Sequence, residues 1–313
     1  MQKQSPKITI ITPVYNGEEY LEETINSVLT AAKDISFEYL VINDGSTDGT
    51  SKILESFGDK IRVIEKANSG ESSTVTLGFG ESKAKLVMVL SADDPLFTSE
   101  IFKNVFEKFD FEPNLVAIYP NWKMIGPKGE LLKIVQVPDF SMDLLLGRCQ
   151  TLPGPGVIIR KSAAISIGGR RSKWTFVGDY DFWLRLSTVG EIRHRNEVLA
   201  QWRMHSSSTS INSRGIRMAT ERLEVVKEFL KEFEVSPNLQ RKALGTSHYM
   251  AARLIFFDPK IHGKRILMLG FWKRKGWIKG AKISVILYII LHPLSRWLYN
   301  KIKKYLPEQL PLQ

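Results

Sequence analysis

Short apolar runs alternate with amphipathic segments along the first third of the chain. Four runs rich in β-branched residues predict strands, at residues 7–15, 38–44, 61–66 and 85–91. The segments that follow them carry apolar residues at helical spacing and predict helices, at residues 18–33, 45–57, 73–83 and 99–109. Because strands and helices alternate at this spacing, the sequence predicts an α/β fold with a doubly wound, mostly parallel sheet.

The rest of the chain is predicted to add shorter and antiparallel elements. Two strand-like segments flank the turn PKGE and predict a hairpin, 116–126 with 131–137. The next segments predict a strand with a short helix and a Gly-rich turn, a second short helix, an extended segment and a helical region, at residues 154–169, 179–190, 191–205 and about 214–259. No internal repeat is visible.

Polar clusters follow the predicted strands at their carboxyl ends. These clusters read PVYNGE, NDGSTDG, NSGESS and SADD. In open α/β sheets, ligands bind beyond the carboxyl ends of the strands. The sequence therefore predicts a ligand site at this edge of the sheet.

The most informative cluster is SADDP, where the apolar run 86–90 stops and Asp93 and Asp94 follow. Adjacent carboxylates at the end of a buried strand repel each other, so they need a cation beside them or a raised pKa. A hard divalent ion such as Mg2+ or Mn2+ is held by one or two carboxylates together with substrate phosphates. A turn at Asp94-Pro95 with a helix N-cap is the alternative that these residues leave open.

Three further residues have a functional interpretation beside an ordinary structural one. Asp44 opens DGSTDGT at a strand end, where a carboxylate can face a nucleobase or ribose, or can form a turn and an N-cap. Asp179 follows Gly178 at a helix start, so it is either an N-cap or a base that reaches the same cleft. His205 lies in RMHSSSTS, where it is either a surface histidine, the usual outcome for a single histidine, or a residue that faces an anion together with the serines and Arg203.

Charge separates a nearly neutral body from a basic C-terminal part. The chain has 313 residues and a formal net charge of +11. Residues 261–313 contribute +10, with 11 Lys and Arg against Glu308 alone, and the first 260 residues contribute +1. A single cysteine, Cys149, excludes an internal disulfide and a cysteine metal cluster, and it favours a reducing compartment. The segment MQKQSPKITI has no long apolar run, so no signal peptide is expected.

Six segments, in order, resemble the motifs of the family 2 glycosyltransferases, which have the A-type nucleotide-sugar-binding fold. The resemblance covers about residues 7–210, in ITPVYNGEEYLEETINSVL, VINDGSTDGT, KANSGESSTVTLGF, LSADDP, GDYDFWLRL and WRMHSSSTS. The chain departs from the family pattern at five positions, namely Asn43, Val75, Thr76, Ser91 and Gly178. The family usually has Asp at the first and fourth of these, an Arg-Asn pair at the second and third, and Glu at the last.

The resemblance implies a role for each candidate residue. Eight residues would bind the nucleotide-sugar: Pro13, Tyr15, Glu18, Asp44, Asn68, Gly70, Ser91 and Asp94. Asp93 would be the principal ligand of Mn2+ or Mg2+, and His205 would face the metal or the diphosphate. Asp179 would be the general base of an inverting transfer to an acceptor hydroxyl. A UDP-sugar is the expected donor, from family frequency alone.

Three other functions compete with this one. A polyprenyl-phosphate sugar transferase would use a lipid phosphate as the nucleophile and would make Asp179 less necessary. A family member that binds nucleotide-sugar or glycan without turnover is favoured by Ser91 and Thr76. A nucleic-acid binder is suggested by the basic net charge. Because the basic residues lie in a part rich in Trp, Tyr, Ile and Leu, no nucleic-acid partner is expected.

The sequence predicts three parts: a catalytic domain at 1–212, a helical segment at 213–260 and a basic amphipathic tail at 261–313. The longest apolar run of the tail, ISVILYIIL at 283–291, is shorter than the ~20 residues of a membrane span. Basic segments that carry aromatic residues bind anionic lipid at the bilayer interface. We therefore expect a peripheral protein on the cytoplasmic, inner face of the plasma membrane, with a glycan or lipid-linked glycan acceptor. The alternative is a tail that packs on the body or forms an oligomer contact.

Overall fold

The computed structural model describes residues 5–206 and 216–256, so the tail predicted at 261–313 lies outside the described residues. The strands are β1 (Ile8–Val14), β2 (Phe37–Asn43), β3 (Arg62–Glu65), β4 (Leu86–Val89), β5 (Leu115–Ile125), β6 (Leu131–Val135), β7 (Ile158–Arg160) and β8 (Glu191–Arg203). The α-helices are α1 (Leu21–Ala31), α2 (Thr50–Phe57), α3 (Glu71–Glu81), α4 (Val105–Phe111), α5 (Lys161–Ser166), α6 (Gly178–Leu186), α8 (Ile216–Glu232) and α9 (Pro237–Phe256). Short 3-10 helices, η1 (Gly58–Lys60) and η2 (Ser99–Phe102), and a π-helical turn, η3 (Asp143–Gly147), complete the described elements.

The described strands form one mixed sheet in the order β3-β2-β1-β4-β7-β5-β6, with β8 also paired to β5. The strands of the first third, β1 to β4, pair with one another in parallel, and β8 is parallel to β5. In contrast, β7 is antiparallel to both β4 and β5, and β6 is antiparallel to β5. The predicted α/β class with a mostly parallel sheet is therefore confirmed, and the predicted hairpin is present as β5 and β6.

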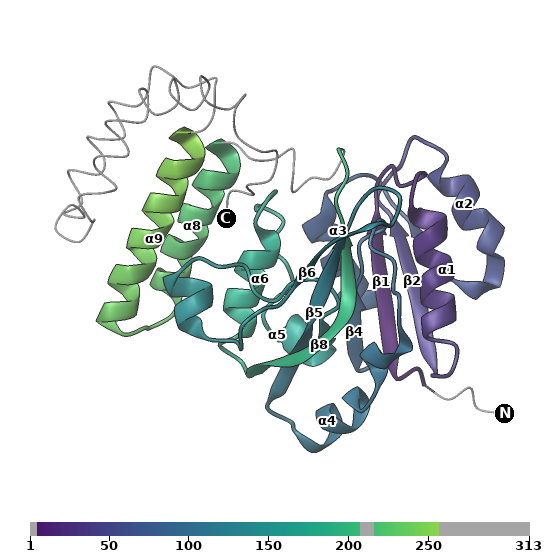
Figure 1. Cartoon of the computed structure of the whole chain (residues 1–313), viewed down its shortest axis with the longest axis horizontal. Helices are drawn as coiled ribbons and strands as arrows, with labels where there is room; N and C mark the ends of the chain where they lie inside the picture. Colours follow the sequence, from purple (N-terminus) through teal and green to yellow (C-terminus); the bar gives the residue numbers. More distant parts are fainter. Residues whose placement is uncertain (1–4, 207–215, 257–313) are drawn as a thin grey trace, which may run out of the picture. The chain divides into compact units, whose positions relative to one another are not determined.

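Each face of the sheet has its own apolar core, because side chains alternate along every strand. On β1, Ile8 and Ile10 belong to the core that α1, α2 and α4 cover. Ile11 belongs to the opposite core, which α3, α5 and α6 cover together with α8 and α9. Figure 1 shows α1 and α2 on the right of the sheet, and α6, α8 and α9 on the left.

The helix predicted at 99–109 is divided into η2 and α4, so this prediction was wrong in its middle. Asn104 has a φ of 58°, in the left-handed region, and this conformation interrupts the helical backbone. Asparagine tolerates that region better than most residues do. Thr98 begins the first piece, since its side chain accepts a hydrogen bond from the backbone N of Glu100.

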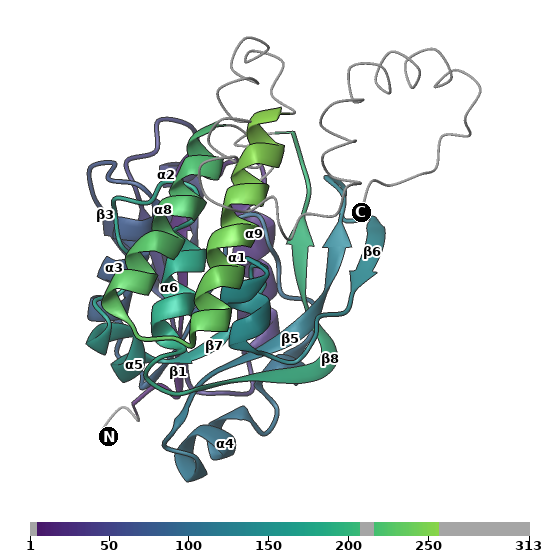
Figure 2. The same ribbon diagram turned by 90° about the vertical axis from the view of Figure 1, so that its left-hand side faces the viewer.

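The helical pattern predicted near the end of the described chain forms two helices that lie side by side, α8 and α9 (Figures 1 and 2). Val225, Val226 and Phe229 of α8 are buried in the same core as α6. No helix among residues 5–206 and 216–256 combines the length and apolar character that a membrane span requires. The core position of α8 brings side chains of this helix close to the ligand site described next.

Candidate active site

A cavity of about 730 Å³ lies where β1 and β4 end. Its volume is in the range that binds small molecules and cofactors. Seven of the predicted site residues line it: Pro13, Tyr15, Ser91, Asp93, Asp94, Asp179 and His205. The other four, Glu18, Asp44, Asn68 and Gly70, are not among its lining residues.

Topology explains why residues far apart in the sequence meet here. Parallel pairing of β1 with β4 brings the loops after both strands to one edge of the sheet. Asp179 reaches the same space from the first turn of α6, and His205 follows the last residue of β8. The cavity therefore has an acid-rich end at the strand loops and a second end at the start of α6.

At the strand-loop end, Asp93 and His205 contact each other directly. Nε2 of His205 lies 2.8 Å from Oδ2 of Asp93, and the ring of Tyr20 lies 4.8 Å from the imidazole. The His205 side chain is 11% exposed and that of Asp93 is 29% exposed. A carboxylate oxygen and an imidazole nitrogen, both at the cavity surface, are suitable ligands for a divalent ion such as Mn2+.

Asp94 has a different environment from its neighbour. Its Oδ1 accepts a hydrogen bond of 2.8 Å from the backbone N of Arg203, and the residue is 4% exposed. Burial, reinforced by the charge of Asp93, raises the pKa of Asp94 well above its ordinary value. The two adjacent acids are thus distinguished, with Asp93 facing the cavity and Asp94 joining its loop to β8.

Arg203 connects the loops at this end of the cavity through its buried side chain. The side chain is 1% exposed, and its Nε donates to the backbone O of Asp93 at 2.9 Å. Nη1 donates to the carbonyl of Pro127, and Nη2 forms an ion pair of 2.7 Å with Glu23. The sequence associated Arg203 with a bound anion, whereas in the structure its guanidinium holds protein groups.

The residues at this end fit the predicted metal ion if substrate phosphate and water supply the remaining ligands. Among the described residues, no group of three or more His, Cys, Asp or Glu side chains could hold a metal ion. Asp93 and His205 provide two donor atoms, so the remaining ligands would have to come from substrate phosphate and water. Mg2+ and Mn2+ are commonly bound in this way, by one or two protein groups plus substrate phosphates.

At the other end, Asp179 occupies the first turn of α6. Its Oδ1 accepts a hydrogen bond of 2.7 Å from the backbone N of Tyr180. Burial raises the pKa of Asp179; the charge of Arg170 opposes this effect and that of Glu71 adds to it. A carboxyl with a raised pKa is a better proton acceptor near neutral pH than an ordinary aspartate is.

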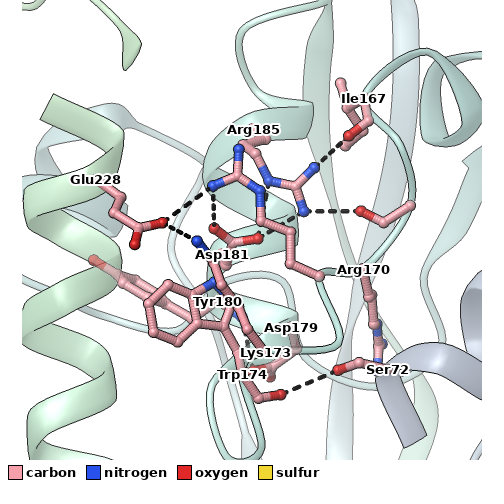
Figure 3. Close-up of polar contacts among 12 residues, drawn as sticks. Ser72, Ile167, Arg170, Lys173, Trp174, Asp179, Tyr180, Asp181, Arg185 and Glu228 are labelled. Carbon is pink, nitrogen blue, oxygen red and sulfur yellow. Dashed lines mark hydrogen bonds and ion pairs between the residues drawn. The ribbon is translucent and has the colours of Figure 1, made fainter. Parts of the chain in front are cut away.

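Position 178, at the start of α6, favours glycine because the hydroxyl of Ser72 occupies the space that a side chain would fill. A Cβ at this position would lie 2.3 Å from Oγ of Ser72. The same hydroxyl donates to the carbonyl of Trp174 at 3.3 Å, a contact drawn in Figure 3. The glutamate usual in the family pattern therefore does not fit beside Ser72.

Thr76, another departure from the family pattern, supports the loop before α6. Its hydroxyl lies 2.8 Å from the backbone N of Arg170 and 3.0 Å from the carbonyl of the same residue. Gly169, with a φ of 68°, brings the loop so close that an added Cβ would lie 2.7 Å from the Thr76 side chain. Thr76 thus fixes the backbone from which Arg170 enters the cavity lining.

A network of charged residues connects this loop to α6 and α8 (Figure 3). Arg185 and Asp181, both 3% exposed, form an ion pair of 2.6 Å, and Arg185 donates to the carbonyls of Ile167 and Gly169. Arg171 pairs with Glu232 of α8 at 2.5 Å. Lys173 pairs with Glu228 of the same helix. These contacts hold the loop before Asp179 against two helices.

The predicted nucleotide-binding residues outside the lining shape neighbouring loops. Asp44 accepts hydrogen bonds from the backbone N of Ser69 at 2.8 Å and of Gly70 at 2.9 Å, and it pairs with Lys66. Glu18 accepts from the backbone N of Gly49 at 2.7 Å. Their contact with a nucleotide stays a prediction of the sequence.

Several residues that line the cavity were not predicted from the sequence. Glu71, Trp122, Arg170, Trp202 and Arg222 all line the cavity, from elements that no shared motif connects. Local patterns contained three of them: Glu71 in NSGESS, Arg170 in the Gly-rich turn GGRR that precedes Asp179, and Trp202 in WRMHSSSTS.

Solved structures first place this architecture in a class. The fold resembles that of the mannosyltransferase PcManGT from Pyrobaculum calidifontis, solved with GDP-Man and Mn2+, with a TM-score of 0.60 and 13% identity over 97% of this chain and 84% of that one. It also resembles S. aureus TarS 1–349 solved with UDP, with a TM-score of 0.53 and 20% identity over 87% of this chain and 88% of that one. The fold is thus the A-type glycosyltransferase fold.

Sequence comparison then shows the family. The model for Glycosyl transferase family 2 matches residues 9–144. An uncharacterized glycosyltransferase of Rickettsia prowazekii (strain Madrid E) is 30% identical over 271 residues, which cover 82% of this chain and 81% of that protein. The chain belongs to glycosyltransferase family 2, as its motifs predicted.

Proposed function

We propose that the chain is an inverting hexosyltransferase that moves a sugar from a nucleoside diphosphate sugar to a hydroxyl of a glycan or lipid-linked glycan. The observation that carries this proposal is the shared cavity. Asp93 and His205 line it from one end, and Asp179 lines it from the first turn of α6. A single displacement needs a base on the acceptor side and charge stabilisation on the leaving-group side, and both kinds of group are present.

Asp179 would act as the general base. It would take the proton of the acceptor hydroxyl while that oxygen forms a bond to the anomeric carbon. The bond from this carbon to the diphosphate breaks on the opposite face, its electron pair leaves with the diphosphate, and the configuration inverts. The raised pKa of Asp179, caused first by burial, supports this role.

Asp93 and His205 would hold Mn2+ or Mg2+ together with oxygens of the donor diphosphate. A divalent ion bound there supplies positive charge that stabilises the leaving diphosphate. Asp94 and Arg203 would act indirectly, because their hydrogen bonds fix the loop that carries Asp93.

A UDP-sugar is the donor that we propose. TarS, which shares the fold, has been solved with UDP and with UDP-GlcNAc. Pro13, Tyr15 and Ser91 would contact the nucleotide-sugar, since they line the cavity. The loops held by Glu18 and Asp44, including Asn68 and Gly70, would complete the nucleotide site.

The test is release of nucleoside diphosphate from UDP-, GDP- and dTDP-sugars by the full-length protein, with and without Mn2+. We expect metal-dependent release from UDP-sugars, and faster release when a glycan acceptor is added. Binding of UDP-sugar without release would favour the non-catalytic alternative. Acceleration by polyprenyl phosphate and not by glycans would favour the lipid-phosphate transferase.

We also propose that residues 261–313 hold the protein on the inner face of the plasma membrane. The support is the sequence alone: a charge of +10 among aromatic and aliphatic residues, outside the described part of the chain. Full-length protein should sediment with anionic liposomes at low salt and be released at high salt. Failure to sediment at low salt would contradict this localisation.

A further inference from the structure

Two arginines with little solvent exposure line the cavity at the end that contains Asp179. The Arg170 side chain is 10% exposed, and Arg222 of α8 is 9% exposed. Both charges act on the carboxyl of Asp179, whose pKa is raised by burial and lowered by each arginine. This end of the cavity therefore contains two cationic groups near the group proposed as the base.

Arg170 uses only one edge of its guanidinium in the described structure. Nη1 forms an ion pair of 2.6 Å with Glu71. Nε is buried and has no hydrogen-bond partner among the described residues. A guanidinium fork binds a carboxylate or phosphate through two parallel hydrogen bonds. With no partner in the part of the chain that the structure describes, the buried Nε is unfavourable in this state, and an anion that replaced Glu71 at the fork would satisfy it. Figure 3 shows the Arg170 side chain extending from the loop toward Ser72.

Glu71, the counterion of Arg170, is easily displaced. Its side chain is 62% exposed, and no other ion pair of Glu71 is found within the described residues. Ion pairs with a solvent-exposed partner contribute little free energy. An anion that reaches the cavity can therefore take the place of Glu71 at small cost.

Arg222 has no carboxylate partner in the described part of the chain. Nη1 donates to the carbonyl of Cys149 at 2.6 Å, and Nη2 donates to the hydroxyl of Thr151 at 3.2 Å. The guanidinium also lies 4.9 Å from the centre of the Tyr180 ring. These contacts satisfy donors with neutral groups, so among the described residues the charge of Arg222 is opposed by the nearby Asp179 carboxyl without a direct ion pair.

We propose that the acceptor carries an anionic group, a carboxylate or a phosphate, which Arg170 and Arg222 bind beside Asp179. This inference rests on the proposed glycosyl transfer, in which the donor diphosphate lies at the other end, with Asp93 and His205. The cavity then holds two anionic sites, one for the leaving group and one for the acceptor. The second site determines which glycans present a hydroxyl to Asp179.

Removal of Glu71 distinguishes the proposed anion site from an ion pair that only supports the loop. If Glu71 competes with the acceptor for Arg170, its removal strengthens anion binding. If the pair only supports the loop, removal of either partner weakens the site. The variants Glu71→Gln and Arg170→Gln therefore have opposite expected effects under the proposal and the same effect without it.

The experiment measures retention of full-length protein, with UDP and Mn2+, on immobilised glycans of three kinds. These are neutral, hexuronate-bearing and phosphodiester-bearing, so the carboxylate and phosphate sources are separated. Wild-type protein should be retained on one kind of anionic glycan at least about tenfold more strongly than on the neutral glycan, because the anionic group would form charge-assisted hydrogen bonds. Arg170→Gln should lose this preference, and Glu71→Gln should increase it about threefold or more. Arg148→Gln, at an arginine whose side chain is 62% exposed, is the matched control and should change nothing.

Three results would overturn the inference. The first is equal retention on neutral and anionic glycans by the wild type, at any level. The second is a decrease in both Arg170→Gln and Glu71→Gln. The third is weaker UDP binding by Arg170→Gln, which would assign this arginine to the donor. Nucleoside diphosphate release by the wild type is scored separately, so failure of the transferase function is distinguishable from failure of the anion site.

Discussion

His205 Nε2 lies 2.8 Å from Asp93 Oδ2, although the histidine follows β8 and the aspartate follows β4. Neither residue alone makes a divalent site. Their contact depends on the sheet, which brings both loops to one cavity, and on Arg203, which bonds to the carbonyl of Asp93. The Asp93–His205 pair is therefore a product of the tertiary structure.

Replacing Asp93 should abolish metal-dependent donor binding. Asp93→Ala removes the cavity-facing carboxylate, and we expect turnover to fall at least ~100-fold, the scale of losing one preorganised electrostatic group. Ser91→Ala should cost much less, because a hydroxyl offers only a hydrogen bond. Calorimetry with UDP-sugar, with and without Mn2+, checks both variants. Unchanged metal-dependent binding by Asp93→Ala would show that the site is misassigned.

Replacing Asp179 should separate binding from transfer. Asp179→Asn keeps the size of the side chain and removes its ability to take a proton, so donor affinity should persist. Transfer should fall by ~100- to 10,000-fold, the usual contribution of general base catalysis. Paired measurements of donor affinity and single-turnover transfer are required. Near-normal transfer by this variant would instead favour a phosphate nucleophile.

The pH dependence of kcat/KM should report the raised pKa of Asp179. A base is active when deprotonated, so activity should fall as the pH decreases through this pKa, above the ordinary aspartate value of ~3.9. Glu71 contributes to the increase, so Glu71→Gln should move the acid limb to lower pH. A limb that persists unchanged in Asp179→Asn would belong to another group.

Arg203 should matter for stability as well as for donor binding. Arg203→Met removes the partly buried hydrogen bonds to the carbonyls of Asp93 and Pro127, so the free energy of unfolding should fall by about 1–3 kcal/mol. Glu23→Gln should change it by less than about 1 kcal/mol, because Glu23 is 54% exposed. Urea denaturation compares the two. Equal losses would mean that the ion pair is the main contribution.

The space between Gly178 and Ser72 can be tested by a double-mutant cycle. Gly178→Ala places a methyl group 2.3 Å from the Ser72 hydroxyl and should cost about 1–3 kcal/mol of stability. Ser72→Ala removes that oxygen, so the double variant should recover most of the loss. Thermal unfolding of the four proteins gives the coupling energy. Additive losses would show that the two positions are independent.

The strands that hold the site could be predicted because their signals are local. Apolar runs bounded by polar turns predicted β1, β2 and β4, and acids at strand ends indicated Asp93. The interruption at Asn104 was missed, since a single left-handed residue leaves the apolar spacing intact.

The position of Arg222 and the partners of Arg203 could not be found from the sequence, for a different reason. Arg222 reaches the site only because α8 packs on the same core as α6. Arg203 looked like a ligand-facing residue, and only the structure shows its partners to be Glu23 and backbone carbonyls. Partners so distant in sequence are selected by packing, and no local pattern encodes them.

The ion pairs that join the loop before α6 to α8 should make the two ends of the cavity respond differently to ionic strength. Arg171 and Lys173 are 26% and 50% exposed, so salt screens their attraction to Glu232 and Glu228. Arg203, at 1% exposure, is shielded from such screening. Salt concentration should thus loosen the end of the cavity that contains Asp179 selectively, and binding measured at that end should depend on the salt in the assay buffer more than binding at the Asp93 end.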